Sequence, residues 1–122
     1  MIAFALILGV LAFPTPVAET GFVTPSGNIA CNAGKNAGRP LLDCTLFSER
    51  TNKGDKVWAM RVTGRVQVGR VIGDPATDYP KLRYGRTWTW HGIRCNSERR
   101  GLTCRNRSAH GFFLSRGSQR VF

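Results

Sequence analysis

The stretch HGIRCNSERRGLTCRN, from His91 to Asn106, places two of the chain's four cysteines on either side of a short ERRG segment. If ERRG forms the loop of a hairpin, the flanking residues pair in register and Cys95 faces Cys104. Directly opposed residues of an antiparallel pair have Cα atoms about 4.5–5.5 Å apart, which is within reach of a disulfide. Gly101 would take the left-handed position that closes such a loop. The spacing therefore predicts a hairpin stapled by a Cys95–Cys104 disulfide.

The other two cysteines have a similar arrangement. Cys31 and Cys44 would face each other across a hairpin centred near GKNAGRP, residues 34–40, which is rich in turn-forming Gly, Asn and Pro. Four cysteines permit three pairings, and we expect Cys31–Cys44 with Cys95–Cys104 because both follow from local hairpins. Zinc ligands normally lie two to four residues apart, and redox centres use Cys-x-x-Cys. Neither a metal site nor a redox centre is therefore expected.

Alternation of apolar and polar residues indicates strands elsewhere in the chain, and helical patterns are nearly absent. In WAMRVTGRVQV, residues 58–68, the apolar side chains share one parity and the arginines and polar residues take the other. This pattern predicts a strand with one buried and one basic face. Gly64 falls on the apolar side and marks either a bulge or a turn that divides the run into two strands.

A second alternating stretch, RTWTWHGIRC, covers residues 86–95. Trp88 and Trp90 share a face, whereas the next apolar residues have the opposite parity, which predicts a bulge at His91-Gly92. Short strands separated by turn segments are typical of all-β proteins. We therefore expect an all-β fold, a small disulfide-stapled antiparallel β-sandwich or barrel with little or no helix apart from a signal peptide.

The N-terminal segment resembles an export signal. The apolar run IAFALILGVLAF, Ile2–Phe13, is followed by a PTP segment and is shorter than the about 20 residues that span a membrane. It fits the apolar core of a secretory signal peptide that ends at Ala18; the alternatives are an N-terminal membrane anchor or a buried strand. Four cysteines in a short exported chain are typical of two disulfides. We expect a signal peptide over residues 1–18 and a single disulfide-bonded β domain over 19–122, secreted or periplasmic, with no stable membrane span in the mature form.

The chain is strongly basic. Its net charge is +11, fourteen of its 18 basic residues are arginine, and residues 81–122 hold ten basic residues and one acid. Such a field attracts a polyanion or an acidic protein, and the planar fork of arginine binds phosphate and carboxylate in pairs of hydrogen bonds. The alternative is a solvated face that maintains solubility. The anion-binding candidates are Arg83, Arg86, Arg94, Arg99, Arg100, Arg105 and Arg107.

Several motifs resemble those of a family of small secreted bacterial proteins of unknown function. They are FVTPSGNIAC at residues 22–31, YGRTW at 84–88, GLTCRN at 101–106 and AHGFFLSR at 109–116. The resemblance implies an exported, disulfide-bonded β domain and supplies no activity. One departure is Ala109, where the family pattern has glycine, so a positive backbone angle there would be strained.

The remaining motifs favour binding over catalysis. His91 and His110 are the only histidines, and beside arginines they could cleave a phosphodiester, one as base and one as acid; the alternative is two histidines bonded locally. TPSGN, residues 24–28, could hold a ligand, although its Pro and Gly are typical of a structural turn. Trp88 and Trp90 among arginines fit either a stacking groove or a core.

We therefore expect a non-enzymatic basic β module that binds an anionic partner: a cell-envelope polymer, a nucleic acid or an acidic protein. It should need no cofactor. It should also need no metal, because the seven acids are not clustered. The first alternative is a small secreted nuclease-like hydrolase that uses His91 and His110. The second is an inhibitor or interaction domain for another secreted protein.

Overall fold

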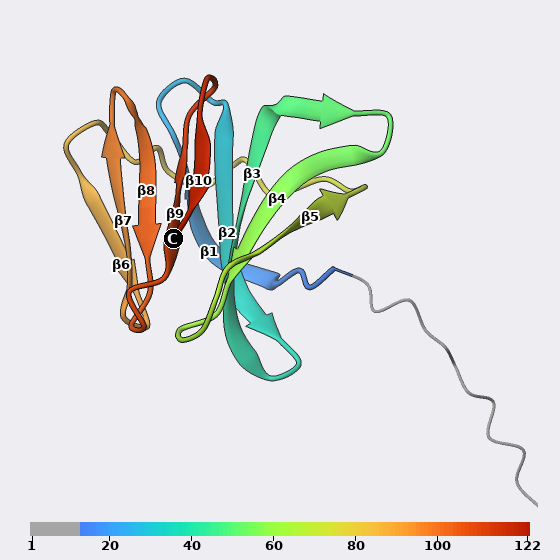
Figure 1. Cartoon of the computed structure of the whole chain (residues 1–122), viewed down its shortest axis with the longest axis vertical. Helices are drawn as coiled ribbons and strands as arrows, with labels where there is room; N and C mark the ends of the chain where they lie inside the picture. The colour runs from blue at the N-terminus through green and yellow to red at the C-terminus, as the bar shows by residue number, and fades with distance from the viewer. Residues whose placement is uncertain (1–12) are drawn as a thin grey trace, which may run out of the picture.

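The protein consists of two antiparallel five-stranded sheets (Figure 1). The structure is a computed structural model, and it describes residues 13–122. The first sheet has the strand order β1-β2-β3-β4-β5 and the second the order β10-β9-β8-β7-β6. Within the described residues there is no helix. The predicted all-β, disulfide-stapled sandwich is therefore confirmed.

The strands follow one another along the chain as a series of hairpins, so each sheet is built from neighbouring segments. The first sheet contains β1 (Val17–Val23), β2 (Ile29–Asn36), β3 (Arg39–Thr51), β4 (Gly54–Met60) and β5 (Gln67–Val71). The second contains β6 (Thr87–Trp90), β7 (Ile93–Glu98), β8 (Gly101–Arg105), β9 (Gly111–Leu114) and β10 (Gln119–Val121).

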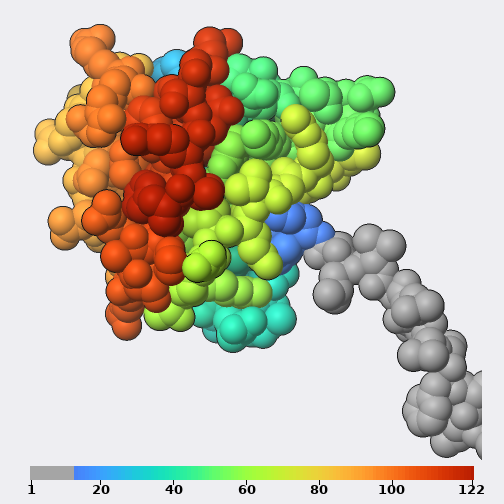
Figure 2. Space-filling model, viewed as in Figure 1, coloured from blue at the N-terminus to red at the C-terminus, as the bar shows by residue number. Residues whose placement is uncertain are grey.

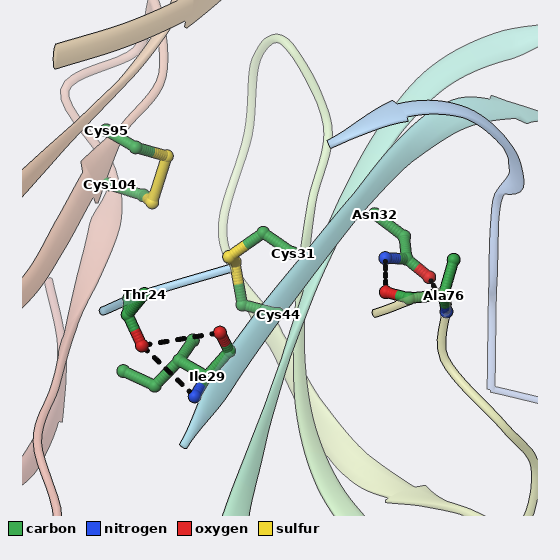
Figure 3. Close-up of a disulfide and its surroundings, with 8 residues drawn as sticks. All are labelled: Thr24, Ile29, Cys31, Asn32, Cys44, Ala76, Cys95 and Cys104. Atoms are coloured by element: carbon green, nitrogen blue, oxygen red, sulfur yellow. Dashed lines mark hydrogen bonds between the residues drawn. A yellow bond between two sulfur atoms is a disulfide. The ribbon is translucent and has the colours of Figure 1, made fainter. Parts of the chain in front are cut away.

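The core lies between the sheets and includes both disulfides. Cys31–Cys44 joins β2 to β3, and Cys95–Cys104 joins β7 to β8, as the hairpin spacing predicted. Figure 3 shows the sulfur atoms of both bridges pointing into the space between the sheets. All four cysteines are fully buried, among apolar side chains from both sheets such as Trp58.

The β7–β8 hairpin has the predicted register, with Cys95 opposite Cys104. Glu98 also pairs with Gly101, so the turn consists of two arginines rather than four residues. Gly101 has a φ of 153°, a positive angle that lies outside the left-handed helical region and that residues with a Cβ rarely adopt. A Cβ there would lie 2.6 Å from the carbonyl oxygen of Leu114, so glycine is required by space as well as by angle.

The bulge predicted at His91-Gly92 is wrong, because these residues form a two-residue hairpin turn. Trp90 pairs with Ile93, and φ is 50° at His91 and 83° at Gly92. Two consecutive positive φ angles match the twist of the flanking strands, and the reversal at this turn accounts for the change of parity. In the earlier apolar run, Gly64 lies in a turn between β4 and β5, the second of the two predicted arrangements.

The start of β1 bears on the predicted domain boundary. Residues 1–12, most of the predicted signal peptide, lie outside the described residues, and β1 begins at Val17, so the boundary after Ala18 falls inside a strand. The ring of Phe13 lies over Gly69, and the carbonyl of Thr15 accepts a hydrogen bond from Asn36 Nδ2 at 3.1 Å. Among residues 13–122, no helix is long and apolar enough to cross a membrane.

Replacing Ala109 with glycine should stabilise the protein. Ala109 has a φ of 62°, a conformation that strains a residue with a Cβ by about 1–2 kcal/mol, whereas glycine adopts it freely at an entropic cost of about 0.5–1 kcal/mol. We expect the free energy of unfolding in urea to rise by about 0.5–1 kcal/mol. Ala76→Gly, at a position without a positive φ, is the control and should destabilise. A lower free energy of unfolding for Ala109→Gly would contradict the strain.

Candidate functional site

The outward face of the second sheet carries two arginines directly opposite each other. Cys95 and Cys104 point into the core, so their neighbours Arg94 and Arg105 point outward, and the two arginines pair in register across β7 and β8. Both arginines are exposed. Like charges at directly opposed positions of an antiparallel pair are destabilising. Folding stability therefore does not explain this pair.

Two further arginines cover an aromatic ring on the same face. Phe113 is only 6% exposed although it points away from the core, because the guanidinium carbons of Arg100 and Arg120 lie 4.9 and 5.0 Å from its ring centroid. Arg105 lies 5.0 Å from the centroid of Phe122, which is 41% exposed. Cation–π contacts of this kind contribute about 0.5–1 kcal/mol at exposed sites. They hold the guanidinium groups in place and leave N–H donors available.

We call this surface the arginine face and define it by six residues. They are Arg94, Arg100, Arg105, Phe113, Arg120 and Phe122. Figure 2 shows the C-terminal segment in red at the front of the molecule, next to the orange atoms of the preceding strands.

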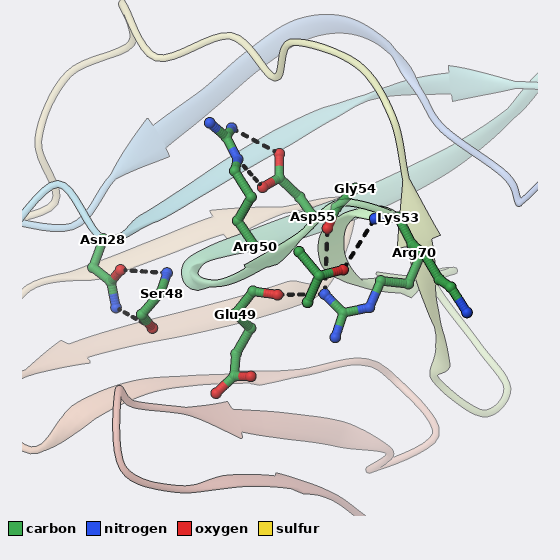
Figure 4. Close-up of polar contacts among 9 residues, drawn as sticks. Asn28, Ser48, Glu49, Arg50, Lys53, Gly54, Asp55 and Arg70 are labelled. Carbon is green, nitrogen blue, oxygen red and sulfur yellow. Dashed lines mark hydrogen bonds and ion pairs between the residues drawn. The ribbon is translucent and has the colours of Figure 1, made fainter.

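Among the described residues, the only acidic side chain that pairs with an arginine of this face is Glu98. All acidic and basic residues lie within the described part of the chain, which contains two ion pairs, Arg50–Asp55 and Arg100–Glu98. The second pair is exposed and long, at 3.4 Å. The first lies on the other sheet, where Figure 4 shows Arg50 bound through two hydrogen bonds of 2.6 and 3.0 Å. Arg94 and Arg105 therefore have no acidic partner among residues 13–122.

The other predicted anion-binding residues lie outside the strands, in turns and connecting segments of the second half of the chain. Arg83 and Arg86 belong to a turn whose backbone bonds to Ser97 of β7. Arg99 follows β7 and lies 5.1 Å from the ring centroid of Tyr84. Arg107 follows β8 at the end of the sheet where Arg94 and Arg105 pair, with its side chain against Gly92.

Of the seven predicted arginines, the structure brings three together on the arginine face: Arg94, Arg100 and Arg105. Sequence reasoning missed Arg120 and the two phenylalanines. The alternation of FFLSRGSQRVF, residues 112–122, contained a signal for them. The sequence alone did not show which residues of the two strands face each other. In the structure, the register of β9 and β10 pairs Phe113 with Arg120.

The two histidines lie at the same end of the second sheet but have separate contacts. His91 follows β6, and its ring packs edge-on against Trp90 at a centroid distance of 4.6 Å. His110 precedes β9, and its Nδ1 lies 3.3 Å from the carbonyl oxygen of Phe122. Within residues 13–122 no hydrogen bond joins the two rings or links either ring to an Asp or Glu side chain. The two rings are therefore held by different neighbours, His91 by Trp90 and His110 by Phe122.

The tryptophans belong to the core side of the second sheet. Trp88 and Trp90 are partly buried against the core cluster, and Trp88 lies 5.1 Å from the ring of Phe22 on the first sheet. Of the two expected positions, a stacking groove or a core, both tryptophans therefore take the core side. Among the residues that the structure describes, no group of three or more His, Cys, Asp or Glu side chains is placed to hold a metal ion.

The comparisons with known proteins identify a family and add no activity. The model of a family of unknown function, DUF6636, matches residues 4–122. No curated protein and no solved structure matches the chain. The family match includes both hairpins that carry the disulfides, the TPSGN turn and the whole arginine face. The chain therefore belongs to this family of unknown function.

Proposed function

We propose that the protein is a non-enzymatic module that binds an anionic partner through the arginine face. The observation that supports this most directly is the exposed Arg94–Arg105 pair. Two like charges held side by side without an acidic neighbour destabilise the fold, and an anion bound between them would remove that repulsion. The guanidinium of Arg105 is also positioned by Phe122, so less side-chain freedom is lost on binding.

The shape of the face favours an extended polymer over a small molecule. The arginines are distributed over three strands and the β7–β8 turn of one sheet, and neighbouring strands lie about 4.8 Å apart. Charges arranged in this way can contact successive groups of a polyanion. Disulfides form in oxidising compartments, which favours a partner in the periplasm, cell envelope or medium.

The test compares two variants that remove the same amount of charge. Arg94→Gln/Arg105→Gln should weaken binding to a duplex DNA oligonucleotide or heparin by about tenfold or more, whereas Lys53→Gln/Arg65→Gln, on the first-sheet side of the chain, should have a much smaller effect. On duplex DNA, the logarithm of the affinity falls with the logarithm of the salt concentration, with a slope of about 0.9 per phosphate contact. The first variant loses two contacts, so the magnitude of its slope should be smaller by about 1.8. The readout is fluorescence anisotropy across a salt series.

Two results would contradict the proposal. One is an affinity that stays constant from low to moderate salt, because charge neutralisation releases counterions. The other is an equal loss of affinity in both double variants, which would show that net charge acts without the arginine face.

A further inference from the structure

Three turns from distant parts of the sequence meet at one end of the sandwich and enclose a groove. They are the TPSGN turn between β1 and β2, the Arg99-Arg100 turn between β7 and β8, and the turn after β9 that contains Arg116. The groove has a volume of about 160 Å³, and its floor consists of core side chains, Ile29, Leu102 and Leu114. We call it the end groove.

The rim of the end groove is cationic. Arg99, Arg100 and Arg116 line it together with one acid, Glu98. Arg99 is positioned by the ring of Tyr84, 5.1 Å from its guanidinium carbon. Arg116 is exposed and forms no ion pair among the described residues, so its guanidinium is free to bind a ligand.

The TPSGN turn adds a hydroxyl group on a rigid loop. Thr24 Oγ1 contacts both backbone polar groups of Ile29, as Figure 3 shows, and the Asn28 side chain is held by two hydrogen bonds to Ser48 (Figure 4). These bonds support the structural role expected for this turn. Ser26 Oγ accepts a hydrogen bond from the backbone N–H of Asn28 at 3.2 Å. Its own O–H therefore remains available as a donor beside the arginines.

We propose that the end groove binds a single phosphate group, the terminal phosphate of the anionic partner. Arginine forks and hydroxyl donors match the oxygens of a phosphate. A volume of about 160 Å³ is below the about 300–1,000 Å³ of pockets that hold drug-sized ligands, and the closed apolar floor favours an end group over a polymer that passes through. Arg100 belongs to both surfaces, so a polymer on the arginine face can reach the groove. The assignment of the partner rests on the proposed function above.

Inorganic phosphate is the probe that tests the groove. Titrated at constant ionic strength into ¹⁵N-labelled protein, it should give saturable chemical-shift changes at Ser26, at Arg99-Arg100 and at Arg116. Loss of a hydrogen bond to a charged group costs about 1.5–3 kcal/mol, so Arg116→Gln should weaken phosphate binding by about tenfold or more. The control is Arg65→Gln, an exposed arginine that does not line the groove, which should leave the affinity unchanged.

The outcomes separate this inference from the proposed function. Shifts that stay linear with phosphate concentration, or an Arg116→Gln variant that binds as the wild type does, would overturn the groove as a site. Those results would leave the DNA and heparin assay unaffected. If phosphate saturates the groove but the protein binds no polyanion, the groove is supported as a phosphate site and the arginine face is not its extension.

Discussion

Replacing Asp43 with asparagine is expected to stabilise the protein at pH 8 and to change its stability little at pH 4. Asp43 lies on the outward side of β3, is 7% exposed, and lines a cavity of about 250 Å³ between the first sheet and residues 71–75. Its carboxyl has no ion pair among the described residues. Burial raises its pKa from 3.8 to about 7, and a backbone hydrogen bond from Asn32 only partly opposes this.

The sign of the pH dependence follows from proton binding. Between about pH 4 and 7 the folded state retains the proton of Asp43 and the unfolded state has released it, so the free energy of unfolding falls as the pH rises. The stability that comes from this raised pKa is fully present below the unfolded pKa of 3.8. It is lost as the pH rises through the folded pKa of about 7. Each pKa unit corresponds to about 1.36 kcal/mol. Asparagine, which cannot ionise, should therefore stabilise the protein at pH 8 by about 2–4 kcal/mol.

Urea unfolding of wild type and Asp43→Asn at pH 4, 6 and 8 measures this difference directly. Asp78→Asn, at an exposed position in the segment that follows β5, is the control for removing one negative charge from a protein of net charge +11. If Asp43→Asn raised the free energy of unfolding by the same amount at all three pH values, Asp43 would not be protonated selectively in the folded state.

The position of Asp43 explains why the sequence did not single it out. Its strand reads LLDCTLF, residues 41–47, and an acid in such an apolar run is a signal of burial. What buries it is a segment about thirty residues further on, held by two hydrogen bonds between the Asn32 side chain and the backbone of Ala76, of 2.9 and 2.8 Å (Figure 3). Local patterns do not contain a contact across that separation.

The hairpins show the opposite case, because their register depends on residues close in the sequence. The spacing around ERRG and GKNAGRP determined which cysteines face each other, and it also implied that Arg94 and Arg105 would be opposed. The HG turn after β6 was missed because Asn-Gly or Asp-Gly is the usual signal for such a turn. The end groove needs three turns to meet, which follows from the packing of one sheet on the other and not from any single segment.

Removing either disulfide is expected to lower the stability of the protein by an amount similar in size to the effect of Asp43→Asn. The bridges span 13 and 9 residues, for which the chain-entropy model gives about 3 kcal/mol each. The four cysteines are fully buried, so alanine at both positions of a bridge also leaves unfilled space in the core. We expect Cys31→Ala/Cys44→Ala and Cys95→Ala/Cys104→Ala each to lose about 3–5 kcal/mol, and the chain without both bridges to be unfolded at 37 °C.

Thermal unfolding followed by circular dichroism measures these losses, which should lower Tm by more than about 10 °C for a domain of this size. If a variant does not fold at all, a second measurement, made on the wild-type protein, still tests the prediction. Because residues around the sulfurs exclude solvent, a thiol reductant should leave both bridges intact in native buffer and reduce them only in urea. Free thiols that appear at the same rate in native buffer and in urea, with the circular dichroism spectrum unchanged, would show that the bridges neither lie in the core nor stabilise it.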